Sequence, residues 1–277
     1  MYSTNALSFT NPNQPNTERI SRRDAILYGT GATLGAITGV VYLNKDTRPK
    51  EHEQRVFRTF SKAIALSDKL SSSSVLLATP NSNTKNTFRI LELGIGSNWQ
   101  TLQRGLYDTD VLNDIQKNKD VSITGVDLLE VPNKTLQKLQ QTNNIELNTV
   151  EGDVCISLPF ENGYFDVITC CFTLCSVQNQ ITALQEMKRM LKPQGTFGFM
   201  EHVAVNKQDS DHGWLESQQL IFDPLQQKLA DNCHLHRDTD VVILDMFGKE
   251  NVLEYERFFV DSMWPVSCQS CGVVVNA

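Results

Sequence analysis

The sequence predicts an α/β fold built on a mostly parallel, Rossmann-like sheet. Residues 88–99, FRILELGIGSNW, form an apolar run that ends in an acidic residue and two closely spaced glycines. Residues 122–127, SITGVD, and 147–153, LNTVEGD, repeat the pattern of an apolar run that ends in a carboxylate. Helical patterns separate such runs, and strands that alternate with helices favour βαβ units with right-handed crossovers.

The other elements follow in the order that this fold needs. Residues 56–70 carry apolar side chains at roughly helical spacing, which predicts a helix ahead of the first strand. A fourth strand is expected at 164–169, YFDVIT. A helix is expected over 178–192, ended by the K-P-Q-G stretch at 192–195, and a fifth strand over 196–200.

The glycines after the first strand indicate a ligand site. Glycine tolerates positive φ and lets a ligand approach the backbone, and in open α/β sheets this turn lies where ligands bind. Gly94 and Gly96 lack the further glycine spacing of the dinucleotide fingerprint, because Asn98 follows them. They fit the shorter E/D-x-G-x-G loop of S-adenosylmethionine-dependent methyltransferases, although a glycine pair also serves purely structural turns.

The carboxylates at the ends of the next strands support a nucleoside ligand. Asp127 ends the second strand, where a carboxylate can accept hydrogen bonds from both ribose hydroxyls. It lies 33 residues after Gly94, more than the roughly 20 of a compact unit, and we attribute the excess to an insertion around 106–119. Asp153 follows the third strand, where a plain turn is the alternative interpretation.

Composition argues against a nucleic-acid partner. The 277 residues carry a formal net charge of −7, and no stripe of lysine or arginine offers a basic face. A base-modifying methyltransferase would usually have an Asn/Asp-Pro-Pro-aromatic tetrad after the fourth strand. Residues 170–173 read CCFT instead, which disfavours nucleobase methylation.

The amino-terminal region predicts a disordered leader and a membrane segment. Residues 1–24 contain few large apolar groups. Residues 25–43 follow with 19 positions free of charge, enough for a helix of about 28 Å across the hydrocarbon core. A retained anchor in the endoplasmic reticulum or another organelle membrane is our first interpretation. A twin-arginine export signal, a transit peptide to a plastid or thylakoid and a buried glycine-rich helix are the alternatives.

Cysteines and histidines show no complete metal-binding pattern, although one pair of cysteines has redox or metal spacing. Seven cysteines, an odd number, do not suggest a disulfide framework, and those in the predicted core are expected to act as small apolar residues. The pair Cys268-x-x-Cys271 lacks a second pair, and the histidines form no H-x-x-x-H or H-E-x-x-H pattern. The sequence therefore predicts no metal site.

Four segments resemble a known family. They are FTLCSVQNQ at 172–180, FMEHVA at 199–204, the Asp-Pro pair at 223–224 and NCHLHRDT at 232–239. Together they resemble the methyltransferase-like seven family, small membrane-anchored enzymes implicated in S-methylation of thiols, whose wider kin methylate quinones and phospholipids. The resemblance runs from about residue 88 to 275. It implies a class I methyltransferase fold with a seven-stranded sheet and helices on both faces.

The resemblance also implies domain bounds and departures from the family pattern. A cap helix and linker are expected at 51–80 and the catalytic domain at 86–277. Residues 97–99, SNW, replace an expected third glycine. We expect Asn98 to take the left-handed conformation that this glycine would have had.

The cofactor implied is S-adenosylmethionine. Glu92 would orient the loop or meet the methionine ammonium group, and Asp127 would hold the ribose. The residues expected to contact the cofactor are Glu92, Gly94, Gly96, Asn98, Asp127, Leu128, Asp153, Val154, Cys171 and Phe172.

The expected reaction leaves little chemistry to side chains. Methyl transfer from a sulfonium is an in-line displacement, so positioning supplies most of the rate. Glu201 and His202 follow the fifth strand, and His202 is our candidate to accept or orient the proton of the acceptor. Its alternative role is a hydrogen bond to the backbone. Residues 214–229 and the helix near Phe57 are expected to cover an apolar site.

The expected acceptor is a small apolar thiol. A quinone or phospholipid acceptor is the alternative, and a membrane-tethered S-adenosylmethionine-binding pseudoenzyme is the non-enzymatic one. A nicotinamide-dependent reductase is disfavoured, because no Tyr-x-x-x-Lys pair or second phosphate-binding glycine is present.

Overall fold

A computed structural model describes residues 48–74, 86–143, 145–206 and 209–277. The helices are α2 (Lys50–Ser74), α3 (Gln100–Gln103), α4 (Thr109–Gln116), α5 (Asn133–Thr142), α6 (Gln180–Met190), α7 (Gly213–Leu229) and α8 (Thr239–Phe247). The strands are β1 (Thr87–Leu93), β2 (Asp120–Asp127), β3 (Glu146–Glu151), β4 (Phe165–Cys171), β5 (Leu191–His202), β6 (Val252–Phe259) and β7 (Cys268–Val275). Short 3₁₀ turns are η2 (Ser210–His212), η3 (Lys249–Asn251) and η4 (Asp261–Met263).

One seven-stranded sheet organises the domain, in the order β3-β2-β1-β4-β5-β7-β6. The pairings from β3 to β5 are all parallel, and β7 runs antiparallel to both of its neighbours. The order reverses between β1 and β4, so the loop after β1 lies at the topological switch point where such sheets bind ligands. The predicted α/β class with a mostly parallel seven-stranded sheet is confirmed.

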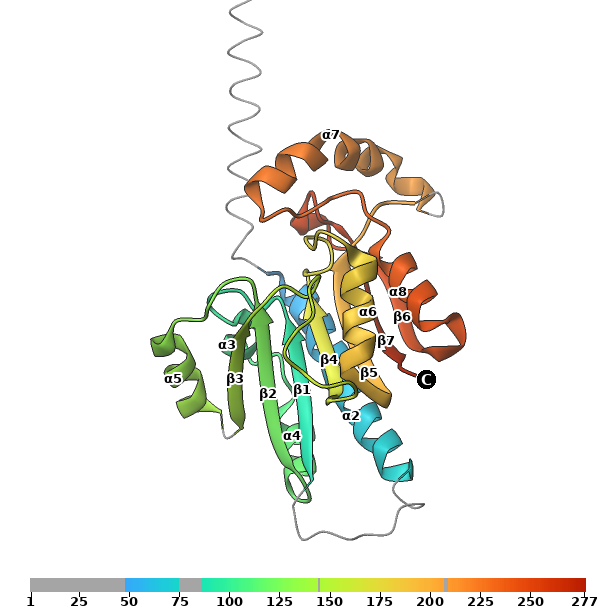
Figure 1. Cartoon of the computed structure of the whole chain (residues 1–277). Coiled ribbons are helices and arrows are strands. Elements are labelled where there is room, and N and C mark those ends of the chain that lie inside the picture. The colour runs from blue at the N-terminus through green and yellow to red at the C-terminus, as the bar shows by residue number, and fades with distance from the viewer. Residues whose placement is uncertain (1–47, 75–85, 144, 207–208) are drawn as a thin grey trace, which may run out of the picture.

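Helices cover both faces of the sheet (Figure 1). Along β1, Ile90 packs in a core cluster with α2 and α4, whereas Leu91 packs in a second cluster with α6 and α8. Neighbouring strand residues point to opposite faces, so a strand buried on both faces is apolar throughout. This explains why the predicted strands appeared as continuous apolar runs.

Several expected bounds differ from the structure. The fifth strand, expected over 196–200, begins at Leu191. The K-P-Q-G stretch is part of β5, and Gln194 within it has a φ of 65°. The helix expected over 56–70 extends back to Lys50 and packs on β4, β5 and β7. The insertion expected at 106–119 folds as α4, whose first turn is capped by the Asp108 carboxylate.

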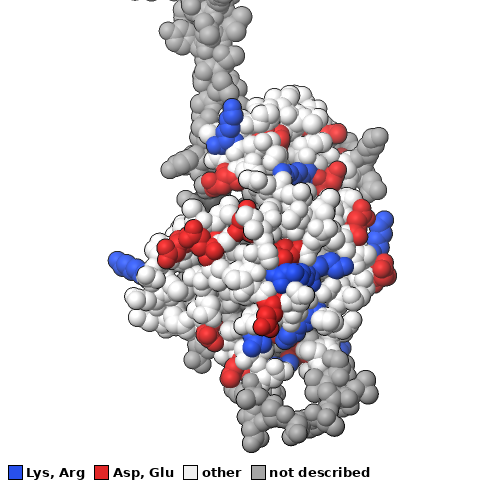
Figure 2. Space-filling model, in the orientation of Figure 1, with Lys and Arg blue, Asp and Glu red and all other residues white. Residues whose placement is uncertain are grey.

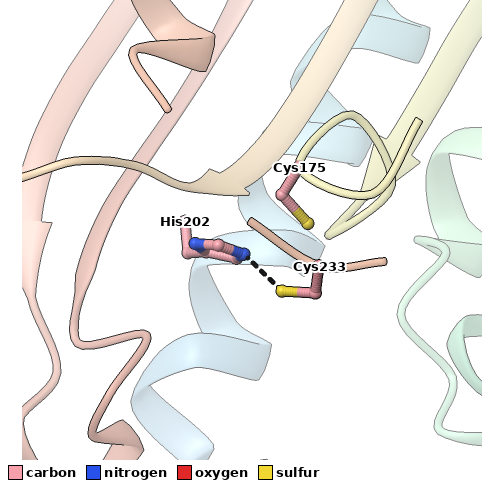
Figure 3. Close-up of side chains that lie close together, drawn as sticks. All are labelled: Cys175, His202 and Cys233. Carbon is pink, nitrogen blue, oxygen red and sulfur yellow. Dashed lines mark hydrogen bonds between the residues drawn. The ribbon is translucent and has the colours of Figure 1, made fainter. Parts of the chain in front are cut away.

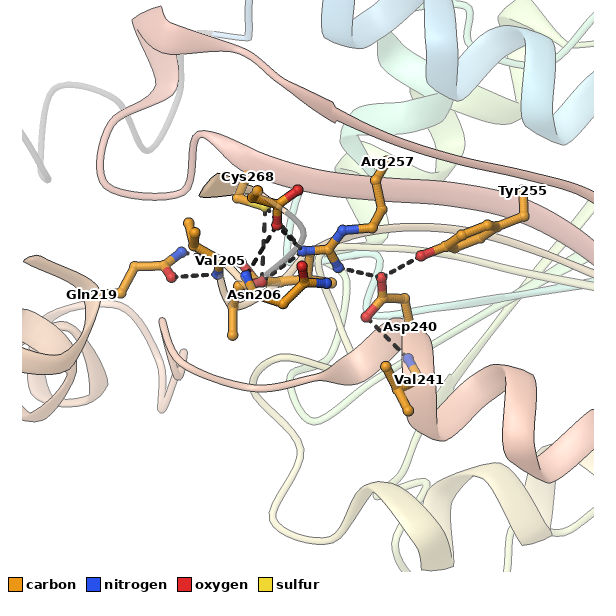
Figure 4. Close-up of polar contacts among 11 residues, drawn as sticks. Val205, Asn206, Gln219, Asp240, Val241, Tyr255, Arg257 and Cys268 are labelled. Carbon is orange, nitrogen blue, oxygen red and sulfur yellow. Dashed lines mark hydrogen bonds and ion pairs between the residues drawn. The ribbon is translucent and has the colours of Figure 1, made fainter. Parts of the chain in front are cut away.

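The carboxyl ends of the parallel strands lie under α7 (Figure 1). A partly buried polar cluster joins the antiparallel strands to the rest of the domain (Figure 4). Arg257 of β6 bonds Asp240 in α8, Asp209 and the carbonyl of Ala204, which follows β5. Tyr255 donates a second hydrogen bond to Asp240 at 2.6 Å. A partly buried guanidinium that is paired with two carboxylates and a carbonyl fixes β6 and α8 beside the end of β5.

The membrane segment expected at residues 25–43 and the leader at 1–24 lie outside the described residues. Among the helices that the structure describes, none has both the length and the apolar character needed to cross a bilayer. On the face drawn in Figure 2, acidic and basic side chains are interspersed.

Candidate functional site

The loop after β1 depends on a glycine at position 94. Gly94 has a φ of +71°, and a Cβ built on it would lie 2.1 Å from the Thr173 hydroxyl oxygen, so no side chain fits there. The Thr173 hydroxyl donates to the Leu93 carbonyl at 2.9 Å and joins the loops after β1 and β4. A Cβ at Gly96 would meet no atom within 4 Å, which leaves the backbone of that residue open to a ligand.

The left-handed residue in this loop is Trp99, and the expectation for Asn98 is wrong. Trp99 has φ 47° and ψ 62°, while Asn98 is exposed and is not among the residues with positive φ. The Trp99 indole is fully buried, and its Nε1 donates to Glu92 at 2.7 Å. Burial of the indole and this hydrogen bond outweigh the cost of a left-handed non-glycine residue.

Glu92 is the buried anchor of the loop. Its carboxylate accepts hydrogen bonds from Trp99, from the Thr101 hydroxyl at 2.6 Å and from the Tyr107 hydroxyl at 2.9 Å. Burial raises the pKa of Glu92, and these hydrogen bonds oppose that shift. The carboxylate is therefore directed at three side chains that follow the loop, and it fixes the path of the chain from β1 into α3.

Asp127 links the second strand to the glycine loop. One carboxylate oxygen accepts from the Gly96 amide at 2.7 Å, and the other accepts from the Leu129 amide at 3.1 Å. A carboxylate offers about four lone-pair positions, so both oxygens retain room for further donors. The side chain is half-buried at the carboxyl end of β2, and Leu128 next to it is 65% exposed.

A cavity of about 280 Å³ lies near the carboxyl ends of β2 and β3, and none of the predicted cofactor-binding residues is in its lining. It is lined by Ile95, Leu129, Glu130, Val131, Thr149, Val150 and Glu151. Beyond β3, Asp153 accepts a hydrogen bond from the Cys155 amide at 2.8 Å, and Val154 is buried against the sheet. The predicted ligand-binding residues after β1, β2 and β3 therefore lie at one edge of the sheet.

The loop after β4 is held by groups from two other parts of the chain. Glu201 of β5 is fully buried and accepts from the amides of Thr173, Leu174 and Cys175 at 2.8, 2.9 and 3.2 Å. Burial raises the pKa of Glu201, and the bonds from the amides oppose that shift. Arg237 donates to the carbonyls of the same loop, most closely at 2.6 Å.

Phe172 begins this loop in a left-handed conformation, with a φ of 55°. Its ring lies 4.9 Å from the His52 ring and 5.5 Å from the His202 ring, between centroids, and the Arg48 guanidinium lies 4.5 Å from its centroid. The Cys171 thiol is 3.8 Å from His52 Nε2, and burial raises the pKa of Cys171 to about 12. This thiol is neutral at physiological pH.

His202 faces a cysteine that the sequence analysis assigned to no site (Figure 3). Its Nε2 lies 2.9 Å from Cys233 Sγ, and Gln226 Nε2 lies 3.6 Å from the same sulfur. A hydrogen bond from Cys175 holds the pKa of Cys233 well below its usual range, although burial opposes this. Burial lowers the pKa of His202, but the sulfur of Cys233 beside it leaves that pKa raised overall.

Over part of its length, this chain is similar to known methyltransferases. The family model described as "Methyltransferase domain" matches residues 108–199. The thiol S-methyltransferase TMT1A of Homo sapiens is 41% identical over 28% of this chain and 30% of its own length. The thiol S-methyltransferase TMT1B of Rattus norvegicus is 30% identical over 56% of this chain and 58% of its own length.

A demethylmenaquinone methyltransferase of Staphylococcus haemolyticus is 41% identical over 28% of this chain and 32% of its own length. The chain is therefore similar to methyltransferases over part of its length, and residues 108–199 match the methyltransferase domain. It spans between about a third and three fifths of the length of these three relatives.

The open edge of this sheet fits S-adenosylmethionine as a ligand. The bare backbone at Gly96 leaves space for the cofactor, and the Asp127 carboxylate beside it can accept from ribose hydroxyls. Sequence reasoning missed Arg237, Cys175 and Cys233 as neighbours of this edge. All three lie in segments that carry the family resemblance, but no spacing between them indicates contact.

Proposed function

We propose that this methyltransferase transfers a methyl group from S-adenosylmethionine to the sulfur of a small apolar thiol. The observation that carries the proposal is the match to thiol S-methyltransferases of human and rat, at 30–41% identity. It agrees with the segments after β4 and β5 that resemble the same family.

Binding and alignment are the main tasks of the protein in this reaction. S-Adenosylmethionine supplies an electrophilic methyl group on a sulfonium centre. The protein backbone at Gly94 and Gly96 would contact S-adenosylmethionine, and Asp127 would bind its ribose. Asp153 and Val154 would flank the adenine beyond β3, and Cys171 and Phe172, at the end of β4, would face the methionine group and the acceptor. Alignment of this kind supplies most of the acceleration.

Glu201 and His202 act in this proposal as positioning residues. Both carboxylate oxygens of Glu201 accept hydrogen bonds from amides of the loop after β4. His202 is buried, and its Nε2 faces Cys233, so its effect on an acceptor passes through the Phe172 ring that it contacts. A free thiol has a pKa of about 8.5, so a fraction is thiolate near neutral pH without a strong protein base.

A transfer assay tests the acceptor. The full chain is incubated with methyl-labelled S-adenosylmethionine and, separately, a small alkyl thiol, a demethylated quinone and phospholipid vesicles. We expect labelled thioether from the thiol alone. Label in the quinone without label in the thiol would indicate a quinone acceptor, as in the name of the demethylmenaquinone methyltransferase relative, and would refute the thiol proposal.

The pseudoenzyme alternative makes a separate prediction. A membrane-tethered binding protein would bind S-adenosylmethionine saturably and label no acceptor. Calorimetric titration of the wild type and of Asp127→Asn separates the two cases. Binding that the substitution weakens, with turnover by the wild type, supports an enzyme.

We further propose that residues 25–43 anchor the chain in a membrane, of the endoplasmic reticulum or another organelle. The support is the run of 19 uncharged, mainly apolar residues. A plastid or thylakoid destination is the alternative if the region is a targeting signal. Membrane fractionation with amino-terminal sequencing of the mature chain tests both, since a chain that starts after residue 43 would exclude the anchor.

A further inference from the structure

Two thiols and one imidazole from separate parts of the chain meet at the end of β5 (Figure 3). Cys175 comes from the loop after β4, His202 from the end of β5 and Cys233 from the turn after α7. The two Sγ atoms and a ring nitrogen lie within 4.8 Å of one another, and each residue is at most 8% exposed. We propose that Cys175, His202 and Cys233 bind one zinc ion.

The donor set suits zinc. Zinc prefers thiolate sulfur and imidazole nitrogen, and soft thiolates exclude the hard cations calcium and magnesium. Zinc–ligand lengths of about 2.3 Å for sulfur and 2.0–2.1 Å for nitrogen give tetrahedral S···S and S···N separations of about 3.8 and 3.6 Å. His202 Nε2 and Cys233 Sγ, now 2.9 Å apart, would separate by less than about 1 Å, which side-chain rotation supplies.

A buried amide provides a second observation at the same place. Gln226 of α7 is 6% exposed, and its Oε1 has no hydrogen-bond partner among the described residues. Its Nε2 lies 3.6 Å from Cys233 Sγ. A half-turn of the amide, which exchanges two nearly indistinguishable atoms, brings Oε1 to the cluster as a fourth ligand.

Charge balance also favours the ion. Two thiolates neutralise one Zn²⁺, so the complete site carries no net charge into the protein interior. Its formation releases the thiol protons, which makes zinc affinity fall at low pH. The ion would join the loop after β4, the end of β5 and the turn after α7, and would hold α7 over the carboxyl edge. The site does not depend on which acceptor is methylated.

Metal analysis of the full chain tests the proposal. After expression with zinc and dialysis against metal-free buffer, we expect about one zinc ion per chain by mass spectrometry. Replacement by Co²⁺ is expected to give the near-ultraviolet absorption of cobalt–thiolate charge transfer. Cys175→Ser, Cys233→Ser and His202→Asn are each expected to lower bound metal at least fivefold. Cys155→Ser, at a cysteine outside the cluster, serves as the matched control and should retain it.

The wild type alone can overturn the proposal, whether or not the variants fold. A folded chain that retains less than a tenth of an ion and gives no cobalt–thiolate band would refute it. Peptide mapping after alkylation that shows a disulfide between Cys175 and Cys233 would also refute it. Loss of methyl transfer with zinc retained would instead count only against the proposed function.

Discussion

The hydroxyl of Tyr107 offers a clean test of the anchor beneath the glycine loop. This side chain is 4% exposed, and its hydroxyl donates to Glu92 at 2.9 Å and lies 3.0 Å from the Thr169 hydroxyl. Tyr107→Phe removes one oxygen atom and leaves the ring in place against Phe60, 5.5 Å away between centroids. The change therefore probes the hydrogen bonds without opening a large cavity.

The magnitude follows from the loss of one hydrogen bond to a buried carboxylate. Such a bond contributes about 1.5–3 kcal/mol, and the free energy of unfolding should fall by that amount. For a domain of this size each kcal/mol lowers Tm by about 2–4 °C, so we expect a decrease of about 3–12 °C. The affinity for S-adenosylmethionine should change less, because Trp99 and Thr101 still hold Glu92.

The assay is urea unfolding and thermal melting of both proteins at pH 7.5, with Tyr164→Phe as the matched control. Tyr164 stacks against Phe160, and its hydroxyl makes no hydrogen bond within the described part of the chain. The control should change the free energy of unfolding by less than about 0.5 kcal/mol. Equal effects of the two substitutions would refute the assignment of Glu92 as a buried anchor.

Three further predictions concern the same edge of the sheet. Asp127→Asn should weaken S-adenosylmethionine binding about tenfold to a hundredfold by calorimetry, since a charge-assisted contact is lost. Glu161→Gln, at an exposed carboxylate ahead of β4, should leave the affinity within about twofold. Gly94→Ala should abolish most S-adenosylmethionine binding, because its Cβ meets a threonine side chain. Gly105 has a similar φ but open space around it, so Gly105→Ala tests backbone strain alone. Equal losses of binding in the two variants would contradict the steric argument. Burial lowers the pKa of His52 from 6.5 to about 4, so the unfolded chain takes up the proton first. Protonation of His52 therefore does not lower the free energy of unfolding above pH 6.5. The free energy of unfolding falls as the pH drops towards 4, and this group reduces it by about 2 kcal/mol at pH 5. His52→Gln should remove that part of the acid sensitivity in urea unfolding at pH 7.5 and 5, and an unchanged pH dependence would count against it.

The edge of the sheet with the proposed ligand site could be predicted from the sequence, because the order of parallel strands determines which residues meet there. Once residues 88–93, 122–127 and 147–151 are parallel neighbours, their carboxyl ends must meet at one edge. The positions of Asp127 and of the glycines after β1 then follow. Strand and helix bounds were less predictable where tertiary pairing extends an element, as when β5 takes in residues 191–195.

Local conformation and distant contacts could not be predicted in the same way. Asparagine tolerates positive φ better than tryptophan, yet Trp99 takes it because its indole reaches Glu92 and the core. No spacing rule joins Cys175, His202 and Cys233, which are brought together by the end of β5 and the return of the chain from α7. Contacts of this kind depend on how three loops pack, and a single sequence carries no periodic signal for packing.

The loop after β4 explains why separate sequence elements accompany one another in this chain. Its amides are satisfied by the Glu201 carboxylate and its carbonyls by the Arg237 guanidinium, so one anion and one cation neutralise opposite sides of the same backbone. A loop held in this way keeps Phe172 in its left-handed conformation and keeps Thr173 against Gly94. The segments 172–180, 199–204 and 232–239 therefore act as one structural unit, which sets the shape of the surface at the carboxyl ends of β4 and β5.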